Sequence, residues 1–408
     1  MVRRTRFSST FSETVPPHGK GPSRWLGVLF LAIGSFSLGV FFACSGDPAA
    51  IAPGQRLLSA AEYAALPVLR IADATPACPS LEQQCQPSYF RTTASSENGW
   101  VVVLGETAKR IQLWRVGPGD SLFRPLGRVG GGPGEYRSVT SLFVDSSGGV
   151  LALDFMMRTL LRYAPDGTPL RSEVIAVPDG YLHDHLTRSG LELIATDPRR
   201  RSSGDSAGVS VYVLEGGKFR RTFTLPMRAR DYRLDELKPV PDAFHPHPQW
   251  ARLPDGSILY SAAATHQVDR FGADGQLAWR SSVEVEPRTI TEEDVQQVVS
   301  HRLRGVGDER LRKAIRERLK ITPSGRLPAV TRIVALINGD VWVRESPRVQ
   351  GDSVSWVVYD GADGAARGRV LLATDDDVLA SRGKSLLFFR SDGPQADATL
   401  QWVSLVAN

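Results

Sequence analysis

Short strands joined by glycine-containing turns recur along most of this chain, and they restrict its possible folds more than any other feature. Six turns each stand directly before an apolar stretch: Asn98-Gly99, Gly148-Gly149, Ser189-Gly190, Asp255-Gly256, Asn338-Gly339 and Arg382-Gly383. Pairs such as Asn-Gly, Asp-Gly and Gly-Gly supply the positive φ angles that a tight two-residue hairpin loop requires. The turns therefore predict six β-hairpins.

A second series of turns follows the first and extends five of the hairpins. These turns lie at residues 117–120, 165–167, 215–217, 273–275 and 362–364. Four antiparallel strands per unit, at a period of roughly 40 to 50 residues, are typical of a propeller blade. The high counts of turn-forming residues, 38 Gly and 27 Pro, agree with many short strands. We predict an all-β fold, a six-bladed β-propeller, over residues 66–408.

The sixth unit is one strand short, and residues 66–71 (LPVLRI) are a candidate for the missing strand. They precede the first complete unit and have no neighbouring strand in the sequence with which to pair. Pairing with the C-terminal stretch TLQWVSLV would close the ring and leave no open edge. The alternative is that residues 66–71 continue the preceding linker.

One segment interrupts the repeated strands. Residues 291–321 have helical chemistry, with Thr291 as a candidate N-cap followed by acidic residues in the first turn. Two apolar stripes in this segment are separated by Gly305 and Gly307, which break the helix in two. We predict a helical insertion at about residues 289–326, between the fourth and fifth blades. Its stripes would pack on the propeller face or bind a partner helix.

The N-terminus combines a basic leader with an uncharged apolar run at residues 25–43, and Cys44 follows directly. This arrangement looks like a bacterial lipoprotein signal, with lipid attached to Cys44 after cleavage. As the alternative, the run could cross roughly 30 Å of hydrocarbon as an uncleaved helix. Either way the basic leader stays inside and the rest is exported. We expect residues 1–44 to be a signal peptide or membrane anchor, and residues 45–65 a linker. The protein would lie in the bacterial cell envelope, facing the periplasm or the exterior.

Cys78 and Cys85 are the only cysteines besides Cys44. In an exported protein, two cysteines that close a short loop indicate a disulfide. Metal binding is the weaker interpretation, because no other cysteine and no nearby histidine completes a site. The sequence therefore predicts a Cys78–Cys85 disulfide.

The distribution of charge gives little information about a partner. The formal net charge is +5, part of it lies in the N-terminal leader, and the other basic residues are scattered among acids. No basic stripe of the kind that binds nucleic acid is visible. We therefore expect no nucleic-acid partner.

Residues 126–136, LGRVGGGPGEY, resemble the Gly-x-x-Gly-x-Gly-Pro-Gly-Glu-Phe signature of bacterial exported six-bladed β-propeller proteins of the NHL-like or TolB-like type, which are often lipoproteins. The aromatic position is Tyr136 here. The resemblance implies the fold and no particular chemistry. A phosphate-cradling loop is the alternative, but the Lys-Ser/Thr ending is missing and a strand rather than a helix follows.

Histidines form the one constellation that could carry chemistry. His183 and His185 begin the predicted inner strand of the third blade, and His245 and His247 precede that of the fourth. Inner strands line a propeller channel, so the pairs could converge and bind a divalent metal through neutral imidazoles. His183, His185 and His247 are the candidate ligands. The alternative is that these side chains only hydrogen-bond loop carbonyls.

Arg332 lies on a predicted inner strand, in TRIV. An arginine at such a position faces either the channel, where it could hold a carboxylate, or the neighbouring blade, where it could form a salt bridge. Both interpretations stay open.

Two functions compete on this sequence. The first is an exported, membrane-anchored propeller that binds or scaffolds an unidentified protein or small molecule as a monomer. The second is a metal-dependent hydrolase or lyase that uses the histidines at the channel mouth. No nucleophile motif is visible, so whether the protein is an enzyme stays open, and we predict no cofactor. Fold alone does not decide between these functions.

Overall fold

The computed structural model divides the chain into two units, Met1–Ala50 and Ile51–Asn408. The structure describes residues 54–77, 89–106, 111–120, 123–176, 181–187, 190–196, 209–215, 218–225, 244, 246–303, 308–318, 325–346, 353–373, 376–390 and 399–407. Cys44, Cys78, Cys85 and His245 lie outside the described residues, as does the apolar run at residues 25–43. No described helix is long and apolar enough to cross a membrane.

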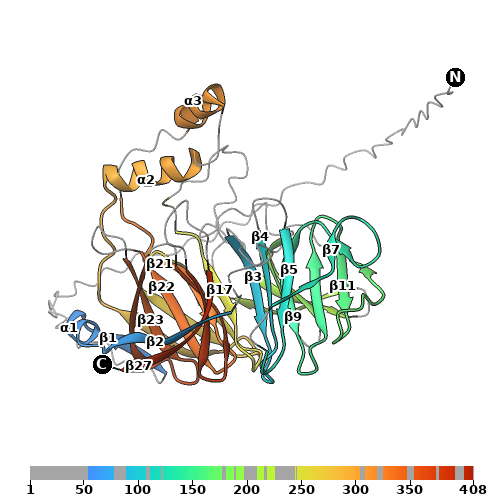
Figure 1. Ribbon diagram of the computed structural model, residues 1–408. Coiled ribbons are helices and arrows are strands. Elements are labelled where there is room, and N and C mark those ends of the chain that lie inside the picture. The colour runs from blue at the N-terminus through green and yellow to red at the C-terminus, as the bar shows by residue number, and fades with distance from the viewer. Residues whose placement is uncertain are drawn as a thin grey trace, which may run out of the picture. The chain divides into compact units, whose positions relative to one another are not determined.

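Four sheets have the strand arrangement of a propeller blade, in which consecutive strands pair antiparallel (Figure 1). The first contains β3 (Tyr89–Ser95), β4 (Val101–Glu106), β5 (Ile111–Val116) and β6 (Arg124–Leu126). The second contains β9 (Val139–Val144), β10 (Val150–Asp154), β11 (Thr159–Tyr163) and β12 (Glu173–Val174). The third contains β13 (Tyr181–Thr187), β14 (Gly190–Thr196), β15 (Val209–Glu215) and β16 (Lys218–Leu225). The fourth contains β17 (Gln249–Arg252), β18 (Ile258–Ser261), β19 (Gln267–Phe271) and β20 (Leu277–Val283).

A larger sheet of eight strands joins two further runs of antiparallel strands through β2 (Val68–Pro76). One run contains β21 (Val330–Ala335), β22 (Asp340–Glu345), β23 (Ser353–Asp360) and β24 (Ala366–Ala373). The other contains β25 (Asp377–Arg382), β26 (Ser385–Arg390) and β27 (Thr399–Ala407). A short parallel pair, β7 (Arg128–Val129) and β8 (Glu135–Tyr136), lies between the first two sheets in the chain. The described strands therefore make an all-β, propeller-like fold.

The pairing predicted for residues 66–71 is present. β2 runs antiparallel to β27, with Leu69 opposite Ala407 and Ile71 opposite Leu405. Its first residues also pair in parallel with β24, where Val68 lies opposite Arg369. The beginning of the strand is therefore enclosed on both sides, and the strand connects the N-terminal part of the fold to the C-terminal part.

The predicted hairpin turns are confirmed where the structure describes them. Five of the six turns contain a glycine with positive φ, at Gly99, Gly148, Gly256, Gly339 and Gly383. Gly148 is needed for a second reason, because a Cβ atom there would lie 2.5 Å from the indole of Trp100. Any other residue would strain the turn and force Trp100 out of its packing position.

The linker predicted over residues 45–65 is wrong from residue 55 onward. β1 (Gln55–Leu58) pairs in parallel with β20, and α1 (Ala60–Ala64) follows behind a Ser59–Glu62 capping box. Tyr63 of this helix is 1% exposed, and its hydroxyl donates a hydrogen bond to the buried Glu345. The segment consists mostly of small and polar residues, but one buried aromatic and a backbone ladder are enough to dock it.

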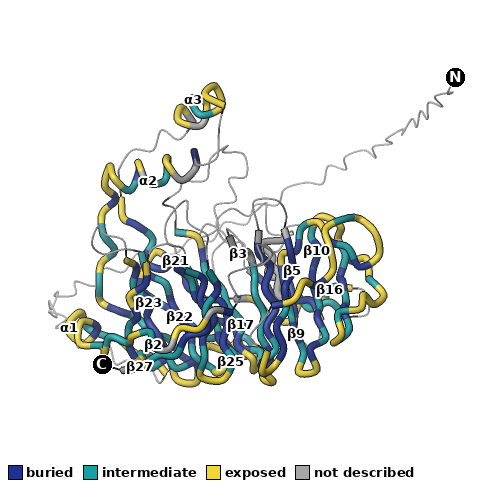
Figure 2. The backbone as a smooth tube through the Cα atoms, viewed as in Figure 1, coloured by how far each residue is buried: buried dark blue, intermediate teal, exposed yellow. Residues whose placement is uncertain are grey.

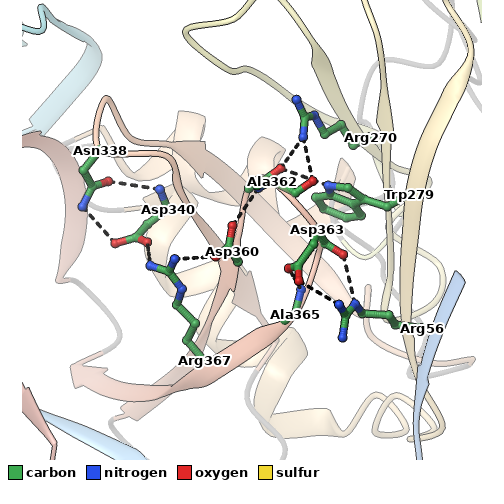
Figure 3. A network of polar contacts seen from close by, with 11 residues as sticks. Arg56, Arg270, Trp279, Asn338, Asp340, Asp360, Ala362, Asp363, Ala365 and Arg367 are labelled. Atoms are coloured by element: carbon green, nitrogen blue, oxygen red, sulfur yellow. Dashed lines mark hydrogen bonds and ion pairs between the residues drawn. The ribbon is translucent and has the colours of Figure 1, made fainter. Parts of the chain in front are cut away.

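A polar network holds the turn between β23 and β24 against the neighbouring sheet (Figure 3). The indole nitrogen of Trp279 and a guanidinium nitrogen of Arg270 donate to the Gly361 carbonyl at 3.0 and 2.7 Å. From β1, Arg56 contacts the Asp363 carboxylate at 2.8 Å. Because residues from the β17–β20 sheet, β1 and the turn meet here, the network fixes two sheets and the N-terminal segment together.

Buried residues follow the strands of the sheets (Figure 2). They form several clusters between sheets rather than one central core. Tyr136 and Val139 pack with Leu104 and Leu113 of the first sheet. In the eight-stranded sheet, the rings of Trp342 and Phe388 meet edge to face with their centroids 6.0 Å apart. The first strands of several sheets also lie side by side: β25 next to β3, β3 next to β9, β9 next to β13, and β17 next to β21.

Two helices, α2 (Glu292–Leu303) and α3 (Glu309–Arg318), follow β20 and precede β21. Thr291 accepts a hydrogen bond from the Asp294 amide, as an N-cap does. Val295 of α2 packs with Phe244, Ile290 and Leu327. In contrast, α3 is largely exposed and lies beyond α2, away from the sheets (Figures 1 and 2).

Candidate functional site

A cavity of about 260 Å³ lies where the first strands of several sheets converge. Its walls come from β3, β14, β15, β17, β18, β21 and β25, and they include Thr93, Ser95, Glu192, Trp250, Arg252 and Arg332. A second cavity of about 480 Å³ shares five lining residues with the first: Thr93, Ala94, Ser95, Arg252 and Ala335. The two cavities are therefore neighbours, and the second reaches the hairpin turn at Pro254, Asp255 and Gly256.

The chemistry of the first cavity centres on the ion pair between Glu192 of β14 and Arg252 of β17. The Glu192 Oε1 and Arg252 Nη2 atoms are 2.7 Å apart, and the two side chains are only 7% and 14% exposed. Each group has a second polar atom that is buried without a hydrogen-bond partner among the described residues, Glu192 Oε2 and Arg252 Nη1. A buried polar atom with no partner is costly, so a ligand or water that bonded either atom would recover part of that cost.

Burial controls the electrostatics of this pair. Loss of solvent raises the pKa of the Glu192 carboxyl above its ordinary value, although the attraction of Arg252 opposes the shift. Loss of solvent likewise lowers the pKa of the Arg252 guanidinium against the attraction of Glu192. In both residues the cost of desolvation exceeds the attraction between the partners. A buried ion pair of this kind is a poor source of stability.

Arg332 contributes a second ion pair at the same cavity. It lines the wall from β21, and its guanidinium contacts the Asp377 carboxylate at the start of β25. The side chain of Arg332 thus lines the cavity and links β21 to β25, the first and last strands in the order of the eight-stranded sheet. The other carboxylate oxygen of Asp377 is buried without a partner in the described part of the chain.

Apolar side chains complete the wall. Trp250 stands beside Tyr260 with their ring centroids 4.5 Å apart, and Ile258, Ile333 and Val334 line the same space. The cavity thus combines apolar side chains with convergent polar groups, as small-molecule sites do.

The structure describes only some of the predicted histidines in full. His183 and His185 lie on β13, and His185 is directly opposite Glu192 in the strand register. The structure does not describe the side chains of these two histidines. His247 is exposed, and its backbone carbonyl accepts a hydrogen bond from Gln249 at 2.9 Å. No group of three metal-ligating side chains occurs among the described residues. Convergence of the histidines therefore stays a prediction.

The glycine-rich loop at residues 126–136 folds back on itself. The Glu135 carboxylate accepts a hydrogen bond from the Gly132 amide at 2.7 Å and pairs with Arg128. The buried Tyr136 hydroxyl accepts from the Leu113 amide at 2.8 Å, which ties the loop to the first sheet. The loop's own carboxylate already contacts the glycine amides, so the geometry agrees with a connector and not with a phosphate cradle.

Glu192 and Arg252 were not among the predicted site residues, although the sequence contains a signal for them. Glu192 stands in the apolar strand LELIAT, and Arg252 ends a strand that begins with Gln249 and Trp250. Charged residues inside strands that the turn pattern already identifies are unusual in a packed sheet protein unless they are paired. The pairing itself depends on how two sheets pack.

Comparison with known proteins supports the fold and identifies no activity. No protein-family model and no curated protein sequence matches the chain. The chain is similar to a solved Bacteroides fragilis protein, provisionally described as exported, with 11% identity and a TM-score of 0.51 over 86% of this chain and 99% of that chain. A Bacteroides vulgatus member of the DUF4221 family gives 10% identity and a TM-score of 0.49 over 84% and 100% of the two chains. A streptogramin B lyase gives 11% identity and 0.43 over 83% and 98%. At these identities the likeness concerns the fold alone.

Proposed function

We propose that this protein is an exported, closed, six-bladed β-propeller that binds a small molecule in its central cavity. The four separate sheets would be four blades, and the two runs of the eight-stranded sheet would be the fifth and sixth. Helices α2 and α3 would then form an insertion between the fourth and fifth blades. The pairing of β2 with β27 supports closure, because it supplies the last run with its fourth strand.

The buried Glu192–Arg252 pair carries the binding proposal. Two charged side chains are removed from solvent at the wall of a cavity, and each keeps one polar atom unpaired within the described residues. An arrangement selected for stability alone would place apolar side chains there, because they avoid the desolvation cost. A ligand that bonds both atoms would recover part of that cost when it binds.

A ligand screen on the full-length protein tests this proposal. We expect at least one small polar molecule to raise the melting temperature of the wild type, since a ligand that binds only the folded state stabilises it by mass action. The double variant E192M/R252M should lose this response, and the control variant E215Q on an exposed pair should keep it. Ligands that stabilise the wild type and E192M/R252M equally would show that the cavity pair is not the site.

Attachment to the envelope through Cys44 belongs to the same proposal. The apolar run and the cysteine that follows it support lipid modification after export. We expect C44S to leave an uncleaved precursor, visible as a larger mass in cell extracts. Labelled fatty acid that never enters the wild type would favour the uncleaved helix instead.

A further inference from the structure

The unpaired atoms of the ion pair specify what kind of ligand group can sit beside them, and this inference rests on the proposed binding function. When the carboxylate is ionised, Glu192 Oε2 accepts hydrogen bonds and cannot donate one. Arg252 Nη1 donates hydrogen bonds and cannot accept one. Each unpaired atom belongs to the same carboxylate or guanidinium group as a paired atom, and the paired atoms are 2.7 Å apart, so one small ligand can reach both groups. A ligand that bonds both groups must therefore present a donor to Glu192 and an acceptor to Arg252.

The charge of the cavity restricts the ligand further. The Glu192–Arg252 pair is net neutral, and so is the pair that Arg332 makes with Asp377. A ligand with net charge would bring an uncompensated charge into a poorly solvated space, which is costly. A ligand with one positive and one negative group adds no net charge, and each of its groups gains a charge-assisted hydrogen bond.

The remaining wall favours an apolar body of small size. Val211, Ile258, Ile333 and Val334 line the space around the ion pairs. The volume of about 260 Å³ is below the range of roughly 300–1,000 Å³ that drug-sized ligands occupy. A body of one or two amino-acid residues fits this limit.

We propose that the central cavity binds a small zwitterion with an apolar side chain, an amino acid or a dipeptide, with its ammonium group on Glu192 and its carboxylate on Arg252. The ammonium donates to Glu192 Oε2, and the carboxylate accepts from Arg252 Nη1. No covalent step is involved, and the site recognises the ligand by charge pairing and apolar contact.

Calorimetric titration of the full-length protein with matched probes tests this proposal. The probes are leucine, leucyl-leucine, 4-methylpentanoate, which lacks the amino group, and 3-methylbutan-1-amine, which lacks the carboxylate. We expect leucine or leucyl-leucine to bind about 10- to 100-fold more tightly than either single-charge analogue, as loss of one charged hydrogen bond implies. In E192Q the preference for leucine over 4-methylpentanoate should disappear, and in E215Q it should remain.

The outcomes separate the two proposals. If both zwitterions fail while another molecule binds the wild type and not E192M/R252M, the zwitterion inference is wrong and the binding function stands. If single-charge analogues bind as tightly as leucine, the inference is also wrong. If no molecule binds the cavity, both proposals fail. The wild-type probe series decides the matter even if E192Q does not fold.

Discussion

A chain that begins at residue 78 is expected to lose its single cooperative unfolding transition and to aggregate, whereas a chain that begins at residue 66 folds as a monomer. The shorter chain lacks β2, which pairs with β27 on one side and with β24 on the other. Its removal uncovers two strand edges at once, and unpaired edges recruit other chains. Thermal unfolding and size-exclusion chromatography of the two chains measure the difference.

A third chain, beginning at residue 51, separates the contribution of β1 and α1. It keeps Tyr63, whose hydroxyl bonds the buried Glu345, so it should be more stable than the chain from residue 66 by about 1–3 kcal/mol. A synthetic peptide of residues 66–77 should partly restore the chain that begins at residue 78 by adding its missing strand. Equal melting temperatures and monomeric behaviour for the chains from residues 66 and 78 would refute the role of β2.

The second large effect is expected at the ion pair in the cavity. E192M and R252M should each lower the free energy of unfolding by about 3–5 kcal/mol, because each leaves the other charge buried without its partner. The double variant E192M/R252M should be close to the wild type or more stable, since both desolvation costs disappear together. Urea unfolding of the four proteins completes a double-mutant cycle.

The exposed pair of Glu215 and Arg220 provides the matched control. Its atoms are 2.7 Å apart, the same separation as in the cavity, but its side chains are 54% and 60% exposed. The variants E215M and R220M should change the free energy of unfolding little, because solvent screens exposed charges. If the double cavity variant were as unstable as the sum of its single variants, the two charges would not be coupled, and the argument from their shared desolvation cost would be wrong.

Local chemistry made part of the fold predictable. Asn338-Gly339 and Arg382-Gly383 indicate hairpins because only a few residue types tolerate the backbone angles of a tight turn, and these glycines have positive φ. The strand partner of residues 66–71 was predictable for a different reason. A repeating unit that lacks one strand needs that strand from elsewhere in the chain.

Other parts of the fold could not be predicted from the sequence, because they depend on contacts between segments that are far apart in the chain. The small and polar residues before Leu66 resemble a linker, yet Tyr63 inserts beside Glu345 and Ser355. No local pattern identifies such a residue, because its burial depends on a gap between two sheets. The same limit applied to Arg332, whose contact with Asp377 depends on where β21 and β25 meet.

The sequence by itself determined most of the strands, their turns, the helical segment and the pairing of the two ends of the fold, because each follows from residue preferences within a short stretch or from the count of strands per unit. Only the tertiary structure decided where the candidate site lies. Glu192 and Arg252 are far apart in the chain, on different sheets, and they meet because those sheets converge. Which charges become neighbours, and which of their atoms stay unpaired, depends on that packing and not on either strand alone.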